Sequence, residues 1–463
     1  MIILAYQDKN KLRESLKEES HERLIEIIIQ QGEQIEQLRS EIESLKQKNE
    51  ELERKQHRQA APFSREESER KSNPKSQGRE KGHKGSYRKE PSTVDETLNV
   101  ELSACPHCQG QISNVRPIEQ FVEELPPIQP KVYKLTTYKG ECRHCGEVQS
   151  SHPLKTSDAT GAAKVQLGPR AKATAIQLNY GYGLSKRNTE QIMRDIYGLS
   201  VTVGGWQHAF HRVGAHCSPD YEDLIKQARN SDYLHSDETS WYIGAPKSWL
   251  WVFTNENQTV YRVSTSRGRE VIQEMIGNDY QGVLISDCLA VYDNVSEKQQ
   301  KCYAHHLKEI SNSMKNHPQE GEGYLKAVEN MLKTAMHIKA LKKEISAERY
   351  QQACENLEAK ADELLLPARG DPVEEHIANR LRKQRDHLFT FLYEEEVDAT
   401  NNLAERQLRP AVIARKISCG NKTRKGANTW QTLSSLIETN RQQGNDSIEY
   451  FKQKATFSTS EQR

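Results

Sequence analysis

The chain has 463 residues, and its 66 Lys and Arg against 65 Asp and Glu give a formal net charge of +1. This balance argues against an overall basic nucleic-acid coat and against an acidic tail protein. The apolar runs are far shorter than the ~20 residues of a membrane span, and the first residues lack a secretory signal pattern. We therefore expect a cytoplasmic protein without a membrane partner, with room for roughly three domains and with its nine cysteines reduced.

A seven-residue apolar repeat runs from Leu24 to Leu52, with Ile at one seam position and Leu at the other. This pattern is typical of a parallel two-stranded coiled coil, in which Asn49 at a seam position would fix the register. One amphipathic helix packed against its own chain is the alternative. We expect residues 1–55 to form a coiled coil that joins the chain into a homodimer or a higher oligomer.

A basic segment follows, because residues 54–91 hold twelve Lys and Arg against five Glu, a net charge of +7. Such a segment buries too little apolar surface to order itself, and its charge attracts phosphates. We predict a flexible linker over residues 56–95 that contacts DNA; a merely solvated linker is the alternative. Its candidate DNA-binding residues are Lys81, His83 and Lys84.

Two Cys-x-x-Cys pairs, Cys105 with Cys108 and Cys142 with Cys145, are separated by 33 residues. Four thiolates can complete the tetrahedral shell of a zinc ion, and each tight turn presents two of them. We expect one structural Zn²⁺ in a small β domain over residues 96–155, whereas a disulfide or redox pair is the alternative. The residues expected to form two short strands between the pairs are Phe121, Val122, Val132, Tyr133, Leu135 and Tyr138.

Residues 160–225 show helical apolar spacing and no strand pattern. A run from Ser185 to Gly198, a short break, and a run from Thr202 to Gly214 have the size of a helix-turn-helix. DNA contact by the second helix is one interpretation, and a small helical bundle without DNA contact is the other. The residues expected to face outward from that helix are Gln207, His208, His211 and Arg212.

From residue 230 the pattern changes to alternating strands and helices. The expected elements are strands at 233–237, 249–253 and 260–263, a helix at 269–276, strands at 282–287 and 301–303, and a helix from 305 to 314. This is the order of a ribonuclease-H-like α/β fold, in which the first and fourth strands are neighbours. We predict such a domain over residues 230–425, with a helical insertion at about 318–396 and a C-terminal helical segment at 426–463.

Two strand-end aspartates, Asp237 and Asp287, would lie side by side in this fold. Adjacent carboxylates repel unless a cation lies between them, so the pair predicts a divalent metal site, although a strand-end Asp often only caps a turn. Glu405, early in a helix that Thr400 or Asn401 could cap, is the candidate third ligand. Two Mg²⁺ or Mn²⁺ ions held there would activate water or a 3′-hydroxyl and stabilise the leaving oxygen of a DNA strand.

A second basic run follows Glu405, and Asn402 precedes Glu405 by three residues on the same helix face. Residues 406–425 hold seven Lys and Arg and no acidic residue. A run of this kind beside an acidic metal site would place a DNA phosphate at the ions. Its candidate DNA-binding residues are Arg406, Arg409, Arg415, Lys416, Lys422, Arg424 and Lys425.

Several motifs, in register over most of the chain, resemble the insertion-sequence-66 family of bacterial transposases. They are the two Cys-x-x-Cys pairs, Gly78-x-x-x-Gly82-His83-Lys84-Gly85, Ser236-Asp237-Glu238-Thr239-Ser240-Trp241, Cys302-Tyr303-Ala304-His305, Thr400-Asn401-Asn402-x-x-Glu405-Arg406-x-Leu408-Arg409-Pro410 and Ser435-Leu436-Ile437-Glu438-Thr439. The resemblance implies a DDE transposase whose triad is Asp237, Asp287 and Glu405, acting at the terminal inverted repeats of its own element. It also implies small companion proteins from that element.

Two positions depart from the family pattern. Cys288 stands where the family usually has Gly, and the helix after His305 begins Leu307-Lys308-Glu309-Ile310 instead of a more basic run. Neither change removes a triad carboxylate. We expect His305 and Asn402 to support the triad from beside it.

These features predict a multidomain α+β protein: an N-terminal coiled coil, a small zinc-binding β domain, a helix-turn-helix-like helical domain, and a ribonuclease-H-like catalytic domain with a helical insertion. The leading hypothesis is a metal-dependent DNA strand-transfer enzyme. One alternative is a catalytically inactive, sequence-specific DNA-binding protein or repressor derived from a transposase. A structural coiled-coil and zinc adaptor is a further alternative.

Overall fold

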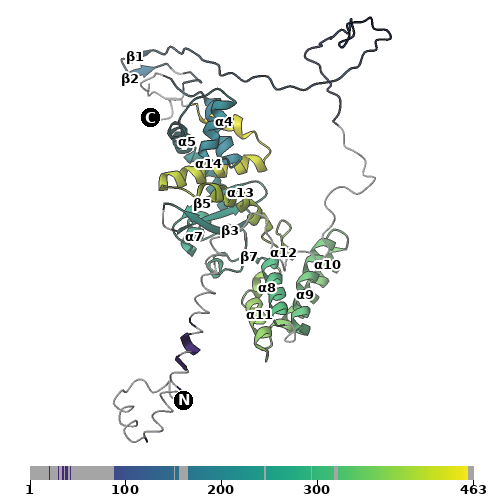
Figure 1. Cartoon of the computed structure of the whole chain (residues 1–463). Coiled ribbons are helices and arrows are strands. Elements are labelled where there is room, and N and C mark those ends of the chain that lie inside the picture. The colour runs from purple at the N-terminus through teal and green to yellow at the C-terminus, as the bar shows by residue number, and fades with distance from the viewer. Residues whose placement is uncertain are drawn as a thin grey trace. The chain divides into compact units, whose positions relative to one another are not determined.

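A computed structural model of the chain describes residues 88–150, 152–155, 165–244, 247–293, 295–317 and 322–456, and single positions between 20 and 42. The chain divides into two units, residues 1–123 and 124–463, and each is described by itself (Figure 1). Most of the predicted coiled coil, and the linker residues Lys81, His83 and Lys84, lie outside the described residues. Within the described part, no helix is long and apolar enough to cross a membrane.

Three seam positions of the predicted coiled coil are described. Ile35, Leu38 and Ile42 are helical, and their exposed fractions are 52%, 54% and 51%. A partner helix would cover these side chains. The single chain does not test that pairing, so the coiled coil stays a prediction.

The segment that carries the Cys-x-x-Cys pairs contains one hairpin within residues 88–150. Strands β1 (Lys139–Cys142) and β2 (Gly146–Gln149) pair antiparallel around the second cysteine pair, and Gly146 takes the left-handed φ of +74° that the turn requires. The prediction of strands at Phe121 to Tyr138 is wrong. These residues have no sheet or core to pack against, as the 93% exposure of Val132 illustrates, and apolar alternation alone does not hold a strand.

The helical region begins at Pro169 and confirms the predicted pair of helices. Ser185 and Thr202 each accept a hydrogen bond from a backbone N–H in the first turn of the helix that follows, which fixes where both helices start. The elements are α3 (Pro169–Ile176), the π-helical turn η3 (Gln177–Gly181), α4 (Lys186–Asp195), α5 (Val203–His216) and α6 (Ser218–Arg229).

A five-stranded mixed sheet follows, in the order β5-β4-β3-β6-β7. Strand β3 pairs antiparallel with β4 and parallel with β6, so the prediction that the first and fourth strands are neighbours is confirmed. The elements are β3 (Tyr233–Tyr242), β4 (Lys247–Thr254), β5 (Thr259–Ser264), α7 (Arg269–Ile276), β6 (Val283–Ser286) and β7 (Gln299–Lys301).

The predicted insertion is helical, as expected from its composition. Its helices share a core with Val283 and Ile285 of β6 and with Tyr303, and so cover the β6 side of the sheet. Helix α8 (Tyr303–Asn316) precedes the insertion, and the helices of the insertion are α9 (Glu322–Leu341), α10 (Ala347–Leu365), α11 (Pro372–Arg382) and α12 (Thr390–Tyr393).

Three helices complete the chain: α13 (Asn402–Ser418), α14 (Arg424–Gln442) and α15 (Ser447–Lys454). The two faces of the sheet divide by the alternation of side chains along each strand. Trp251 and Phe253 face a core shared with α6 and α7, whereas Leu250 and Val252 face a core shared with α13.

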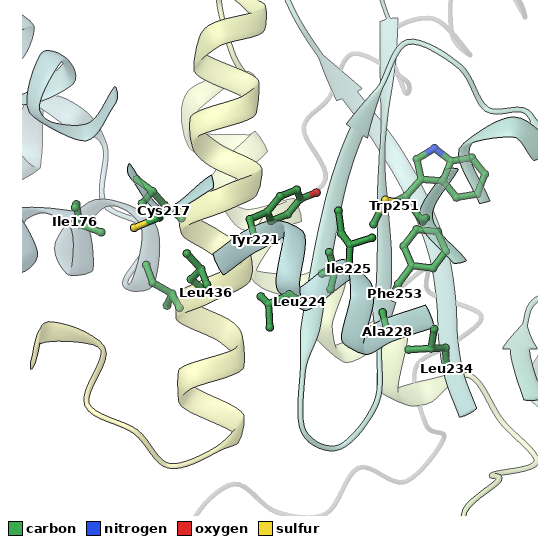
Figure 2. Close-up of a cluster of buried hydrophobic side chains, with 14 of the residues drawn as sticks. Ile176, Cys217, Tyr221, Leu224, Ile225, Ala228, Leu234, Trp251, Phe253 and Leu436 are labelled. Carbon is green, nitrogen blue, oxygen red and sulfur yellow. The ribbon is translucent and has the colours of Figure 1, made fainter. Parts of the chain in front are cut away.

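Helix α14 connects the helical region to the sheet. Figure 2 shows Leu436 of α14 beside Cys217 and Tyr221, and the same buried cluster continues to Trp251 and Phe253 of β4. The helical region and the sheet therefore share one continuous core, and the domain boundary expected at 225–230 does not separate two cores.

The edge strand β5 is covered by polar side chains of α14. Every fourth residue of the helix accepts a hydrogen bond from every second backbone N–H of the strand, because four residues of helix and two of strand rise by similar lengths, about 6 Å. The pairs are Thr259 N–H to Thr439 Oγ1 (3.1 Å), Tyr261 N–H to Ser435 Oγ (2.8 Å) and Val263 N–H to Gln431 Oε1 (3.0 Å).

Candidate active site

The register of β3 and β6 aligns the two predicted aspartates. Tyr233, Leu234 and His235 pair with Val283, Leu284 and Ile285, a constant offset of 50 residues. The same offset takes Asp237 to Asp287, two positions beyond the last pair. Both aspartates are half-buried: Asp287 directly follows β6, and Asp237 lies midway along β3, two residues after its parallel pairing with β6 ends. The carboxyl ends of parallel strands are where such sheets place ligands.

The pleat of β3 separates Asp237 from its acidic neighbour Glu238. His235 contacts Asn401 at the start of α13, whereas Ser236 and Glu238 hydrogen-bond to Tyr292 on the opposite face. Because side chains alternate along a strand, Asp237 lies on the face that α13 covers.

Asn401 ties the start of α13 to β3. Its Nδ2 donates to the carbonyl oxygen of Ser236 at 2.8 Å, and its Oδ1 accepts from His235 Nδ1 at 3.1 Å. Asn401 is the residue before the helix, as predicted, but its side chain bonds to the strand instead of capping the helix. The Glu405 N–H donates to the Asn401 carbonyl at 3.2 Å, so Glu405 lies one turn from this anchor.

Asp287 and Glu405 are close enough to Asp237 to affect its protonation. The pKa of Asp237 is raised to about 7, chiefly by burial and to a smaller extent by Glu238, Asp287 and Glu405, against the lowering effect of the Glu238 N–H. The Cys302 thiol, and more weakly Asp287 and Glu405, raise the pKa of His305 against the effect of burial. His305 is therefore beside this acidic cluster, as expected, whereas Asn402 is exposed.

The described residues contain no group of three or more His, Cys, Asp or Glu side chains that could hold a metal ion as they stand. The donor chemistry of the triad still fits a hard divalent cation, because carboxylate oxygens are the ligands that Mg²⁺ takes. A cation would also relieve the burial and repulsion that oppose the ionised form of Asp237.

An ion pair between a buried carboxylate and an exposed guanidinium lies behind Asp237. The Glu238 side chain is only 2% exposed, and its Oε1 accepts from Arg267 Nε (3.0 Å) and Nη2 (2.7 Å). Its Oε2 accepts from the Tyr292 hydroxyl at 2.8 Å, and the Arg267 guanidinium lies over the Trp249 ring. Glu238 is thus held rigidly on the face away from α13.

The IS66 transposase family model matches residues 164–429. The chain belongs to this family. A relative from Sinorhizobium fredii (strain NBRC 101917 / NGR234), named "Uncharacterized protein y4qI", is 21% identical over 405 residues, covering 78% of this chain and 72% of the relative. Its name assigns no activity, so the family match carries the assignment as a transposase.

Cys288, which departs from the family pattern, fits its surroundings in this transposase. Its Sγ lies 3.4 Å from His306 Nε2, and burial raises the pKa of the thiol to about 11. The thiol is therefore neutral and packs beside the site. Asp287 Oδ1 still accepts from the Leu289 N–H at 3.0 Å, which orients the carboxylate next to it.

The basic run of the transposase is exposed with one exception. Arg415 is partly buried, and its Nη1 donates to Thr239 Oγ1 (3.1 Å) and Ser240 Oγ (2.6 Å) of β3. This arginine holds α13 on the sheet, and DNA contact by it stays a prediction. The exposed members of the run are Arg406, Arg409, Lys416, Lys422, Arg424 and Lys425.

Each cysteine pair lies in a tight turn, one pair in each unit. Backbone N–H groups of Cys108 and His107 lower the pKa of Cys105, and those of His144 and Cys145 lower the pKa of Cys142. A lowered thiol pKa favours the thiolate that binds zinc.

Two contributions were missed by sequence reasoning. The sequence pattern indicates Asn401 only as a possible helix cap, and Glu238 only as one residue of the motif at 236–241. The available signals were the two adjacent asparagines before Glu405 and the alternation of Asp237 with Glu238, which places one of the two acids on each face.

Proposed function

We propose that this transposase cleaves DNA and transfers strands at the terminal inverted repeats of an insertion sequence, with divalent metal ions held by Asp237, Asp287 and Glu405. The observation that supports the proposal is the offset of 50 residues between β3 and β6, which continues from their paired residues to Asp237 and Asp287 on these neighbouring central strands. The strand order is that of a ribonuclease-H-like fold, in which these two strands carry catalytic carboxylates.

In this proposal the chain's own residues hold the metal ions and orient the DNA substrate. Asp237 and Asp287 approach the substrate from β3 and β6, and Glu405 from α13, whose first turn is fixed by Asn401. Two bound Mg²⁺ or Mn²⁺ ions would supply the activated water or 3′-hydroxyl and stabilise the leaving oxygen.

Exposed arginines of α13 lie close to Glu405 along the helix and can contact the substrate. Arg409 follows Glu405 by four residues, so both lie on one face of the helix, and Arg406 is adjacent. Their guanidinium groups can hold a DNA phosphate while the carboxylates act on the next bond.

The decisive experiment compares the protein with Asp237→Asn, Asp287→Asn and Glu405→Gln in Mg²⁺ or Mn²⁺ on DNA carrying the ends of the element. We expect loss of cleavage and strand transfer with DNA binding retained. Cleavage at the original rate by any of the three variants would remove that residue from the triad. Binding without cleavage by the unaltered protein, under every metal and companion-protein condition, would favour the inactive DNA-binding protein.

We also propose a structural zinc held by Cys105, Cys108, Cys142 and Cys145, and a homodimer formed by residues 1–55. Support comes from the lowered thiol pKa values of Cys105 and Cys142 and from the apolar repeat. Elemental analysis should find one Zn²⁺ per chain, lost in Cys142→Ser. Light scattering should find the mass of a monomer after removal of residues 1–55; an unchanged mass contradicts the coiled-coil interface.

A further inference from the structure

Exposed cations gather where α4, α5 and the start of α14 meet. Lys186 opens α4, His208 lies on α5, Lys422 precedes α14, and Lys425 lies in its first turn; all four side chains are exposed. Within the described part of the chain, no carboxylate forms an ion pair with any of these lysines. Two exposed lysines of the helical insertion differ, since Lys326 and Lys333 both pair with Glu329.

The backbone that carries these cations is firmly fixed. Helices α5 and α14 touch at Gly214, where an added Cβ would lie 3.1 Å from Thr429 Cγ2. His211 Nδ1 hydrogen-bonds to Thr429 Oγ1 at 2.7 Å, and its Nε2 lies 2.9 Å from Gln207 Nε2. Gln207 and His211, expected to face outward, are thus partly buried against α14.

The loop before α14 is anchored to the end of β3. Asn421 Oδ1 accepts from Trp241 Nε1 at 2.9 Å, and the Asn421 N–H donates to the Tyr242 carbonyl at 2.9 Å. Gly420 allows this approach, because a Cβ there would lie 2.6 Å from the Tyr242 oxygen. Lys422 therefore follows a rigid anchor.

The positive charges are close enough to repel one another. Lys186 is exposed but partly surrounded by protein, and this partial burial, then the charge of Lys422, lowers its pKa. Burial, then Lys425, Lys186 and His208, lowers the pKa of His211. Like charges held together without a carboxylate partner are stabilised when an anion binds.

We propose that Lys186, His208, Lys422 and Lys425 form one surface, the α4–α14 surface, which binds the phosphate backbone of duplex DNA. The inference rests on the proposed function, which supplies DNA as the anion, and deepens it by joining the helical region to the second basic run. The surface is separate from Arg406 and Arg409 beside the triad.

Duplex DNA fits this surface better than a membrane does. Membrane-bound helices place large apolar side chains beside their cations. Among the described residues, none of the exposed large hydrophobic side chains falls within 183–190, 203–216 or 420–428. Cations on three rigid elements suit a row of phosphates.

The test compares Lys186→Ala/Lys422→Ala/Lys425→Ala with a control of equal charge loss, Lys343→Ala/Lys360→Ala/Lys383→Ala, in which three exposed lysines of the insertion are removed. Affinity for a duplex carrying the element's end is measured by fluorescence anisotropy at several salt concentrations. The slope of log K against log salt is negative, and each lost phosphate contact lowers its magnitude by about 0.9. We expect this magnitude to fall by roughly 2–3 in the first variant and to stay unchanged in the control.

An unchanged slope in the first variant, with an unfolding temperature equal to that of the unaltered protein, overturns the α4–α14 surface. Lys422→Gln, which keeps the length of the side chain, should lower the magnitude of the slope by about 0.9 and decides the matter should the triple variant misfold. If the triple variant loses binding to anionic lipid vesicles while its DNA binding is unchanged, the surface binds a membrane, and this result also overturns the proposal.

The same proteins separate this inference from the proposed function. A reduced slope in the triple variant, together with metal-dependent cleavage that Asp237→Asn does not abolish, keeps the surface and rejects the triad. An unchanged slope with cleavage that Asp237→Asn abolishes keeps the triad and rejects the surface.

Discussion

The Asn401 carboxamide nitrogen donates a hydrogen bond to the carbonyl oxygen of Ser236 at 2.8 Å, across 165 residues of chain. The same side chain accepts from His235, and Asn401 is completely buried. Because Oδ1 is the acceptor, the neutral His235 ring carries its proton on Nδ1; burial lowers the pKa of this histidine and so favours that neutral form. The helix that carries Glu405 is therefore fixed to the strand that carries Asp237.

Asn401→Ala should loosen this connection. Loss of the carboxamide leaves the Ser236 carbonyl and the His235 ring unpaired in a buried place, which should cost roughly 1–3 kcal/mol of unfolding free energy. Displacement of Glu405 should lower cleavage by roughly 10–100-fold while DNA affinity stays unchanged. Asn402→Ala, at the exposed neighbour, is the matched control for both denaturant unfolding and single-turnover cleavage. Equal effects of the two variants would show that Asn401 does not position Glu405.

Asp237→Asn should stabilise the metal-free protein, and more at high pH than at low pH. The folded pKa of about 7 lies above the ordinary value of 3.8, chiefly through burial. Between these two values the folded protein keeps a proton that the unfolded chain releases, so the unfolding free energy of the unaltered protein falls as pH rises. We expect Asn to raise Tm by roughly 2–4 °C at pH 8 in EDTA and by much less at pH 4.

The same pair of proteins tests metal binding without turnover. Mg²⁺ held by the proposed triad would bind the folded protein and not the unfolded chain, so it should raise Tm of the unaltered protein at pH 8 and have little effect on Asp237→Asn. A Tm difference between the two proteins that is equal at pH 4 and pH 8 would rule out the raised pKa of Asp237.

Arg267→Ala should destabilise the protein by roughly 2–4 kcal/mol, since it leaves the buried Glu238 carboxylate without its cation. The double variant Arg267→Ala/Glu238→Gln should recover part of this loss, because the uncompensated charge is gone. Arg269→Ala, two residues along and exposed, is the control. Denaturant unfolding of all four proteins gives the coupling free energy, and a value near zero would show that the ion pair adds nothing.

Ser435→Ala should expose the Tyr261 amide to exchange. The serine hydroxyl accepts from that N–H, and β5 is the edge strand of the sheet that the described residues form, so no described strand replaces the serine. We expect a loss of roughly 1–3 kcal/mol and faster hydrogen exchange at Tyr261, with smaller changes at Leu250. Asn428→Ala, exposed on the same helix, should leave the exchange rates unchanged. Undiminished protection of Tyr261 in Ser435→Ala would contradict the assigned hydrogen bond.

Most of the sheet could be predicted from sequence because strands such as β4 and β6 are short, apolar and bounded by turn residues. Gly282 to Asp287, for example, can only be a buried strand or part of a buried helix, and its length favours the strand. The offset that aligns Asp237 with Asp287 then follows from the parallel pairing. Local pattern and tertiary structure agree here. The polar strand β7 lies at Gln299–Lys301 and not at the expected 301–303.

Other features depend on contacts that no local pattern contains. Val132 and its neighbours alternate like a strand, yet nothing covers them, so their apolar character predicted structure wrongly. The polar residues of α14, such as Gln431 and Ser435, suggest an exposed helix until β5 is placed beside them. Asn401 looks like a helix cap until β3 is known. In each case the partner lies far away in the sequence.

The cover that α14 gives to β5 has a consequence during synthesis of the protein. Ser435, which accepts the hydrogen bond of the Tyr261 amide, is synthesised 174 residues later. At ~5–20 residues per second, this delay is roughly 9–35 s. Throughout that time the outer edge of β5 is free to pair with any extended strand that meets it. A nascent chain is therefore most prone to aggregate before its last helices emerge, and chaperones that bind unpaired strands should engage it in that interval.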